Sequence, residues 1–117
     1  MVGAGGHAKV LLETLRITKW NVIGLIAKDI IKDGILYGIK VLGDDQVIQE
    51  FSPDEVELVN GIGSLPGNML RWELAKKFRS KGFSFSQIIH PSTCIAEDVI
   101  IFQGAQVMAG SVLQSGV

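Results

Sequence analysis

The chain has few of the features that mark several protein classes. Its single cysteine, Cys94, cannot support an internal disulfide framework, and one thiol is consistent with the reducing cytoplasm. The 11 basic and 12 acidic side chains nearly cancel and form no block of one sign, which argues against nucleic-acid binding. No signal-peptide pattern occurs. With 47% apolar and 20% charged residues, the sequence predicts a cytoplasmic globular protein.

Charge is also missing from the last 19 residues, 99–117, a length that can span a membrane. This stretch nevertheless contains three glutamines, and its three glycines recur every six residues. On a helix that spacing turns each glycine by roughly 120° from the last, so no glycine face for helix packing forms. We therefore expect no membrane span here.

The first 89 residues alternate between helix-like and strand-like patterns. Apolar residues fall on one helical face over residues 8–18, and residues 20–27 form a β-branched, almost wholly apolar run typical of a buried parallel strand. Residues 28–38 are expected to be an exposed loop. A strand, a helix, a strand, a helix and a strand are then expected over residues 39–42, 43–51, 56–62, 66–81 and 83–89. This alternation predicts a parallel sheet with helices on both faces.

The expected helix over residues 66–81 has a clear inward face and a clear end. Its inward residues at helical spacing are Leu70, Leu74, Ala75 and Phe78. Gly82 is expected to end it, because glycine readily adopts the left-handed conformation that follows a helix.

A different period begins at residue 89. A bulky aliphatic residue recurs every six positions: Ile89, Ile95, Ile101, Val107 and Leu113. Three places after the last four of these stand residues that tolerate positive φ: Asp98, Gly104, Gly110 and Gly116. A six-residue period of this kind is typical of a hexapeptide parallel β-helix, in which the aliphatic residues point inward. We therefore divide the chain into residues 1–88 and 89–117.

The chain opens on a glycine-rich turn with the pattern G-x-G-x-x-A, from Gly3 through Ala4, Gly5, Gly6 and His7 to Ala8. Such a turn leaves a strand sharply, bares its backbone and starts a helix whose N-terminus binds phosphate. The alternative is a tight strand-to-helix turn with no ligand. Little strand precedes the turn, so we interpret the chain as part of a longer one.

Two further features bear on this turn. The helix dipole disfavours protonation of His7, and the neutral ring is expected either to donate a hydrogen bond to a phosphate or sugar, or to cap the helix. Dinucleotide sites also need an acid at the end of the second strand, where Ala27 and Lys28 stand instead and Asp29 comes slightly late. This departure weakens an NAD-binding interpretation.

Other polar residues are assigned simpler roles. Gly63 lies at the expected end of a strand, either in a ligand-binding loop or in a plain connection. Arg71 is expected either on the solvated face of its helix, which we favour, or within reach of an anion. His90 is read as structural and Cys94 as unreactive, and no metal site is expected, because no second ligand stands at suitable spacing.

Three segments together resemble one family. They are residues 3–10 (GAGGHAKV), residues 60–64 (NGIGS) followed by Arg71, and residues 88–92 (IIHPS) running into the hexads. The family is that of the bacterial sialic acid O-acetyltransferases and UDP-4-amino-sugar N-acetyltransferases, the NeuD/PglD-like enzymes of surface-glycan and bacillosamine biosynthesis. The resemblance extends over the whole chain.

The resemblance implies a Rossmann-like domain that binds a nucleotide-sugar acceptor, and a left-handed β-helix that binds acetyl-CoA and forms a homotrimer. It assigns acceptor contacts to Gly5, Gly6, His7 and Gly63, and the phosphate loop to Gly3, Ala4 and Ala8. The family's paired aspartates are replaced by Ala27 and Lys28. Its catalytic histidine lies on a later coil, beyond Val117, so no catalytic residue is assigned here.

Two other functions stay open at this point. The glycine turn can belong to an NAD-dependent oxidoreductase, or the chain can be a sugar-nucleotide-binding module without catalysis. Binding of NAD in place of a nucleotide-sugar would favour the first.

Overall fold

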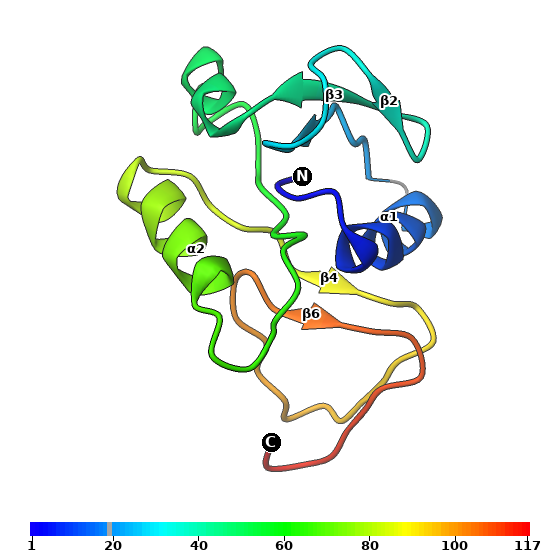
Figure 1. The fold of residues 1–117 in the computed structure, drawn as a ribbon. Coiled ribbons are helices and arrows are strands. Elements are labelled where there is room, and N and C mark those ends of the chain that lie inside the picture. The colour runs from blue at the N-terminus through cyan, green and yellow to red at the C-terminus, as the bar shows by residue number, and fades with distance from the viewer. Residues whose placement is uncertain (19) are drawn as a thin grey trace.

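The structure is a computed structural model that describes residues 1–18 and 20–117. Its two α-helices, α1 (Gly6–Ile17) and α2 (Leu70–Ser80), lie on opposite sides of a set of central strand segments (Figure 1). A 3-10 helix, η1 (Asp45–Glu50), stands where the sequence predicts a short helix over residues 43–51. The arrangement confirms the predicted α/β class.

The central strand segments run parallel. β1 (Leu25–Ile26) pairs with β3 (Ile39–Gly43), and Val2 bridges Ile26 on one side and Asn60 on the other. The predicted strands over residues 20–27 and 56–62 are thus present only as short ladders and single bridges. Val2 therefore lies between the segment of Ile26 and the segment of Asn60. The residues that follow Val2 leave the sheet at the middle of its carboxyl edge.

One prediction was wrong at residues 28–38, which are not all loop. β2 (Ile35–Leu36) forms a hairpin with β3 and is antiparallel to it. The two residues at the tip, Tyr37 and Gly38, have φ of 53° and 76°. Two consecutive positive φ values are typical of a type I′ turn, whose twist matches that of the hairpin strands. Tyrosine is not among the residues that usually occupy this turn.

The start of α2 also differs from the prediction. The helix begins at Leu70 and not at residue 66, and the side-chain oxygen of Asn68 accepts a 2.8 Å hydrogen bond from the Leu70 N–H. Leu70 is 45% exposed, whereas Leu74 and Phe78 are buried as expected. Gly82 ends the helix with φ of +90°, as its position predicts.

Apolar residues gather in two buried clusters, one associated with each α-helix. The cluster beside α2 contains Val2, Ile26, Val47, Ile48, Leu58, Leu74, Phe78, Phe83 and Phe85. The cluster beside α1 contains Leu11, Leu12, Leu15, Leu25, Val41, Val59 and Ile88. Together they hold the central segments in place, because burial of apolar surface is the main favourable term in folding.

The hexapeptide region, residues 89–117, returns over itself below both helices (Figure 1). β4 (Ile88–Ile89) pairs in parallel with β6 (Gln106–Val107), and β5 (Cys94–Ile95) with β7 (Val112–Leu113). Side-chain bonds link turns with an offset of 18 residues, such as the 3.0 Å bond from the Gly110 N–H to Ser92 Oγ. This offset equals three hexads.

The aliphatic residues of the six-residue period are all half-buried: Ile89, Ile95, Ile101, Val107 and Leu113. Ile100 and Phe102, which flank Ile101, are 74% and 75% exposed. The region contains only turns and short strands. No helix in the described part of the chain is both long and apolar enough to cross a membrane.

Candidate functional site

The glycine turn leads directly from the central strand into α1. Gly3 has φ of +94°, and its N–H donates a 2.8 Å hydrogen bond to the Ile26 carbonyl. Gly5 is the N-cap residue of α1, and no side chain caps this helix start. The first N–H groups of a helix have no partner within it. Those of Gly6 and His7 therefore remain donors for a ligand at the carboxyl edge of the sheet.

The glycines of the turn fall into two kinds. A Cβ on Gly3 would lie 2.9 Å from the Gly61 carbonyl carbon, and one on Gly61 would lie 2.8 Å from the Val2 carbonyl oxygen. Both glycines are therefore required for close backbone packing. A Cβ on Gly5 or Gly6 would meet nothing within 4 Å. The space beside their backbone is therefore empty, and a phosphate could approach the N–H groups there.

A cavity of about 390 Å³ adjoins this open backbone. The glycine turn, the end of β1 and the side of α2 contribute to its walls through Gly3, Ala4, Gly5, Ile26, Ala27, Leu70 and Leu74. Three charged residues also line it: Lys28, Asp29 and Asp45. The cavity has the mixture of apolar wall and few polar groups that small-molecule sites share.

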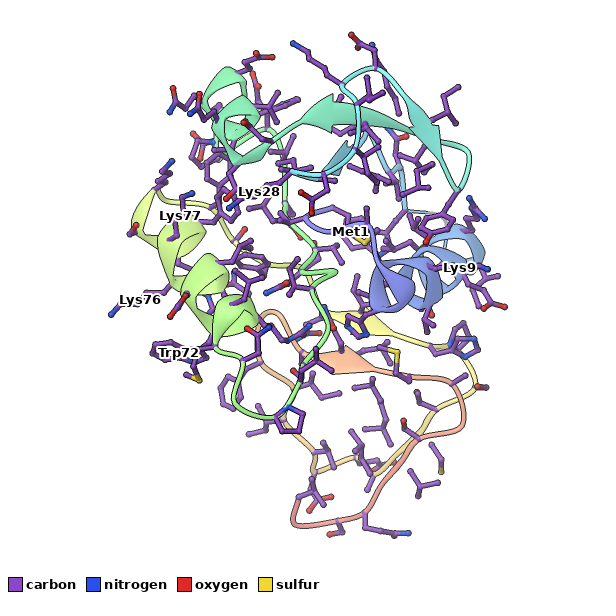
Figure 2. All side chains as sticks on the ribbon, viewed as in Figure 1. Met1, Lys9, Lys28, Trp72, Lys76 and Lys77 are labelled. Carbon is purple, nitrogen blue, oxygen red and sulfur yellow. The ribbon has the colours of Figure 1, made fainter. Side chains whose placement is uncertain are left out.

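Asp45 lies in the cavity although the sequence analysis did not assign it there. Its carboxylate lies 3.7 Å from the Lys28 ammonium and 3.1 Å from that of Lys77, and its side chain is 12% exposed. Figure 2 shows both lysines on the same side of the molecule, toward α2. Two carboxylates therefore line the cavity, that of Asp29 just after β1 and that of Asp45 at the start of η1. No local pattern signals this, because the contact depends on how η1 packs.

A second group of polar residues joins the turn to the hexapeptide region. His7 Nε2 and Arg71 Nη2 each lie 2.8 Å from Gln106 Oε1, and Gln106 Nε2 donates a 2.7 Å hydrogen bond to the Asn60 carbonyl. Arg71 also donates to the Asn60 and Ile62 carbonyls. The prediction of a solvated Arg71 was wrong, and partial burial lowers the pKa of its guanidinium.

Gly63 lies beside His7, since a Cβ on Gly63 would lie 3.6 Å from the His7 Cβ. The structure therefore brings together the four positions to which the family resemblance assigns acceptor contacts: Gly5, Gly6, His7 and Gly63. The side chain of His7 does not cap its helix.

The other residues singled out from the sequence lie away from the turn. His90 Nδ1 accepts a 3.0 Å hydrogen bond from the Ser92 N–H, a local turn contact. Cys94 is exposed in β5. No cluster of three or more histidine, cysteine or acidic side chains with metal-binding geometry occurs among residues 1–18 and 20–117.

A larger cavity, of about 470 Å³, lies at the opposite end of the strands. Met1 and Trp20 line it together with three carboxylates, those of Asp54, Glu55 and Glu57. A negative lining opposes an anionic ligand, and no helix N-terminus is described there. Of these two cavities, the one at the glycine turn is therefore the stronger candidate for a phosphate-containing ligand.

Comparison with known families identifies the first part of the chain. Residues 1–78 match the PglD N-terminal domain. The chain belongs to the PglD N-terminal domain family. Membership in this family confirms the resemblance drawn from the glycine turn and the downstream motifs. No curated protein matches the chain with significant similarity.

Solved structures extend this likeness beyond the PglD N-terminal domain. A mutant of perosamine N-acetyltransferase from Caulobacter crescentus, in complex with CoA and GDP-perosamine, is 34% identical with a TM-score of 0.84. The match covers 97% of this chain and 52% of that one. The acetyltransferase domain of PglB from Neisseria gonorrhoeae is 27% identical with a TM-score of 0.77, over 95% of this chain and 53% of that one. The same domain in complex with acetyl coenzyme A is 28% identical, with a TM-score of 0.78.

The chain thus spans about half the length of the solved proteins that it resembles. The hexapeptide region lies within the matched part, because the match covers nearly all of this chain. The likeness therefore includes both the glycine turn and the region that contributes Gln106.

Proposed function

We propose that this chain is the acceptor-binding part of an acetyl-CoA-dependent acetyltransferase that acts on a nucleotide-activated amino sugar in surface-glycan biosynthesis. One observation carries the proposal. The backbone of Gly5 and Gly6 is open at the start of α1, and Gly5 borders a cavity of about 390 Å³. The similar Caulobacter crescentus structure is a complex with GDP-perosamine, a ligand that contains a diphosphate and an amino sugar.

The charges around the cavity suit the parts of such a ligand. The diphosphate would lie over Gly5 and Gly6, where the helix dipole and the free N–H groups favour an anion. Gly3, Ala4 and Ala8 shape this loop. The ammonium group of Lys28 adds a positive charge at the wall, and the carboxylate of Asp45 can accept hydrogen bonds from ribose hydroxyls or from base N–H groups.

The acceptor sugar would extend toward His7 and Gly63, which lie side by side. His7 is tied to Gln106 in the hexapeptide region, so the sugar end of the ligand would face that region. In this proposal the nucleotide lies on residues 1–88, and residues 89–117 begin the part that carries the acyl donor.

We propose that residues 89–117 form the first coils of a left-handed β-helix. The strand pairing at an offset of 18 residues supports this, since three hexads make one coil. Acetyl-CoA would bind between neighbouring β-helices of a homotrimer. A coil buries its apolar surface only against the next coil or another chain, which favours such an assembly.

The reaction is a direct transfer. The sugar amine attacks the thioester carbonyl, a C–N bond forms, and the C–S bond breaks to release CoA. A general base takes the amine proton, which ends on the CoA sulfur. The proposal assigns this base to no residue of the chain; the residues named above bind and orient the acceptor.

The competing NAD-dependent oxidoreductase is less well supported, because the end of β1 carries Ala27 and Lys28 where a ribose-binding acid is expected. Calorimetric titration of the purified chain separates the two. GDP-perosamine should bind and NAD should not. Binding of NAD in preference to the nucleotide-sugar would overturn the proposal, as would the absence of any binding by GDP-perosamine and UDP-sugars.

A further inference from the structure

Gln106 is the point at which the glycine turn and the hexapeptide region meet. It lies in β6, 99 residues after His7, and its side chain is in hydrogen-bond contact with His7, Arg71 and Asn60. All three contacts are between 2.7 and 2.8 Å. These are ordinary lengths for well-formed hydrogen bonds.

The partners of Gln106 determine which way its amide points. A guanidinium can only donate, so the atom that faces Arg71 Nη2 must be the amide oxygen. A backbone carbonyl can only accept, so the atom that faces the Asn60 oxygen must be the amide nitrogen. Two independent contacts, one to the amide oxygen and one to the amide nitrogen, therefore fix the orientation of the Gln106 amide.

The same oxygen lies 2.8 Å from His7 Nε2. Because this oxygen can only accept, His7 Nε2 must carry the proton and donate. The other ring nitrogen, Nδ1, has no hydrogen-bond partner among the described residues. No buried side-chain nitrogen or oxygen among them lacks a partner, so Nδ1 is open to solvent.

We propose that Gln106 is a positioning residue: held by Arg71 and Asn60, it fixes neutral His7 as the Nε2–H tautomer, so that His7 presents Nδ1 to the acceptor site as a hydrogen-bond acceptor. While the ring is neutral, the ligand group that meets His7 Nδ1 is a donor, such as a hydroxyl or an N–H group, and not a phosphate oxygen. This rests on the proposed function for the identity of the ligand, but the tautomer does not depend on it.

The consequence for binding differs from the role expected from the sequence. A neutral His7 uses its one N–H on Gln106 and has none left for a phosphate. Phosphate binding is left to the backbone of Gly5 and Gly6, and His7 selects a donor group of the acceptor sugar. The hexapeptide region thereby contributes to acceptor recognition.

Long-range ¹H–¹⁵N correlation spectra of the ligand-free chain test the tautomer directly. At about pH 8, above the usual histidine pKa of about 6.5, each spectrum shows which ring nitrogen bears the proton. Only two histidines contribute, and His90 is an internal reference because its Nδ1 accepts from the Ser92 N–H. Both rings should be protonated on Nε2. A proton on Nδ1 of His7 would overturn the proposal.

Substitutions of Gln106 test the cause of this tautomer. In Gln106→Leu the His7 Nε2–H should exchange faster with water and the Nδ1–H form should become detectable, with His90 unchanged. Gln106→Glu keeps an acceptor for His7 and should retain the Nε2–H signal. The control Gln103→Leu makes the same change at an exposed position of the same region. A His7 spectrum that is the same in Gln106→Leu as in the control would overturn the proposal.

Binding of GDP-perosamine tests the consequence. Gln106→Leu should weaken affinity about five- to tenfold, the value of one hydrogen bond. In a double-mutant cycle with His7→Ala, it should cause no further loss, because Gln106 acts through His7. Independent, additive losses would overturn the positioning role. If the unsubstituted chain binds no nucleotide-sugar, the proposed function fails, whereas the ligand-free spectra still decide the tautomer.

Discussion

Valine at two glycines of the turn should affect different properties: Gly3→Val should lower stability, and Gly5→Val should lower ligand affinity. Gly3 needs positive φ and has no space for a Cβ, whereas Gly5 has extended backbone and open space. Gly3→Val adds backbone strain of about 1–3 kcal/mol and overpacking of about 1–3 kcal/mol against Gly61. The sum, about 2–6 kcal/mol, is a large part of the stability of a domain of this size.

Gly5→Val should leave stability almost unchanged. The loss of glycine as N-cap and the reduced entropy of the unfolded chain offset each other to within about 1 kcal/mol. Its side chain, however, occupies the space above the start of α1. Two phosphate contacts to backbone N–H groups are worth together about 3 kcal/mol or more, so affinity for GDP-perosamine should fall more than about hundredfold.

Thermal melts and calorimetric titrations of both variants check this pair. Gly3→Val should lower the melting temperature by at least about 8 °C. Gly5→Val should melt within a few degrees of the unsubstituted chain and fail to bind. If Gly5→Val binds with undiminished affinity, the phosphate does not lie at the turn. If Gly3→Val is as stable as the unsubstituted chain, the argument from close backbone packing is wrong.

Three further predictions concern charged groups. Asp45→Ala should lower affinity for GDP-perosamine and leave stability within about 1 kcal/mol, because its lysine partners are exposed. Asp44→Ala should leave this affinity unchanged and cost about 1 kcal/mol of stability, because the cap to the Gln46 N–H is lost. Equal effects of the two variants on affinity would contradict this. Lys28→Ala should weaken binding severalfold, and Lys40→Ala, at an exposed pair with Asp33, should not. Hydrogen bonds from Ser115 and Gly116 lower the pKa of Asp98, so its contribution to stability is present above its usual pKa of 3.8 and is lost as pH falls through the lower folded value. NMR titration of its carboxyl group checks this, and an Asp98 pKa at or above the usual value would refute it.

The parts of the fold that could be predicted are those where one local pattern decides. Leu11, Leu12 and Leu15 recur at helical spacing and are buried in α1 as expected. The six-residue period from Ile89 could also be recognised, because each repeat has a bulky aliphatic residue at the same position. The glycine turn could be located because few other residues reach the backbone conformation of Gly3.

The parts that were missed depend on contacts between distant segments. The hairpin tip at Tyr37 carries no usual turn residue, so the positive φ there had no signal. Arg71 was expected in solvent because nothing in its own helix indicates a partner; its acceptors come from Asn60, Ile62 and Gln106. The tertiary arrangement decides these contacts, and the sequence spacing does not.

The same limit applies to the candidate site. Gly5, Gly6, His7 and Gly63 could be proposed because they stand in recognisable loops. Asp45 could not, because its role depends on how η1 packs against the end of β1.

Amide chemical shifts of the ¹⁵N-labelled chain, followed during titration with GDP-perosamine, test the central claim most directly. The account predicts that the largest saturable changes occur at Gly5, Gly6 and His7, with smaller ones at Lys28 and Asp45. Addition of NAD should leave these amides unchanged. Changes confined to the cavity beside Trp20 and Glu57, or no saturable change at the glycine turn, would contradict the claim that this turn holds the nucleotide-sugar.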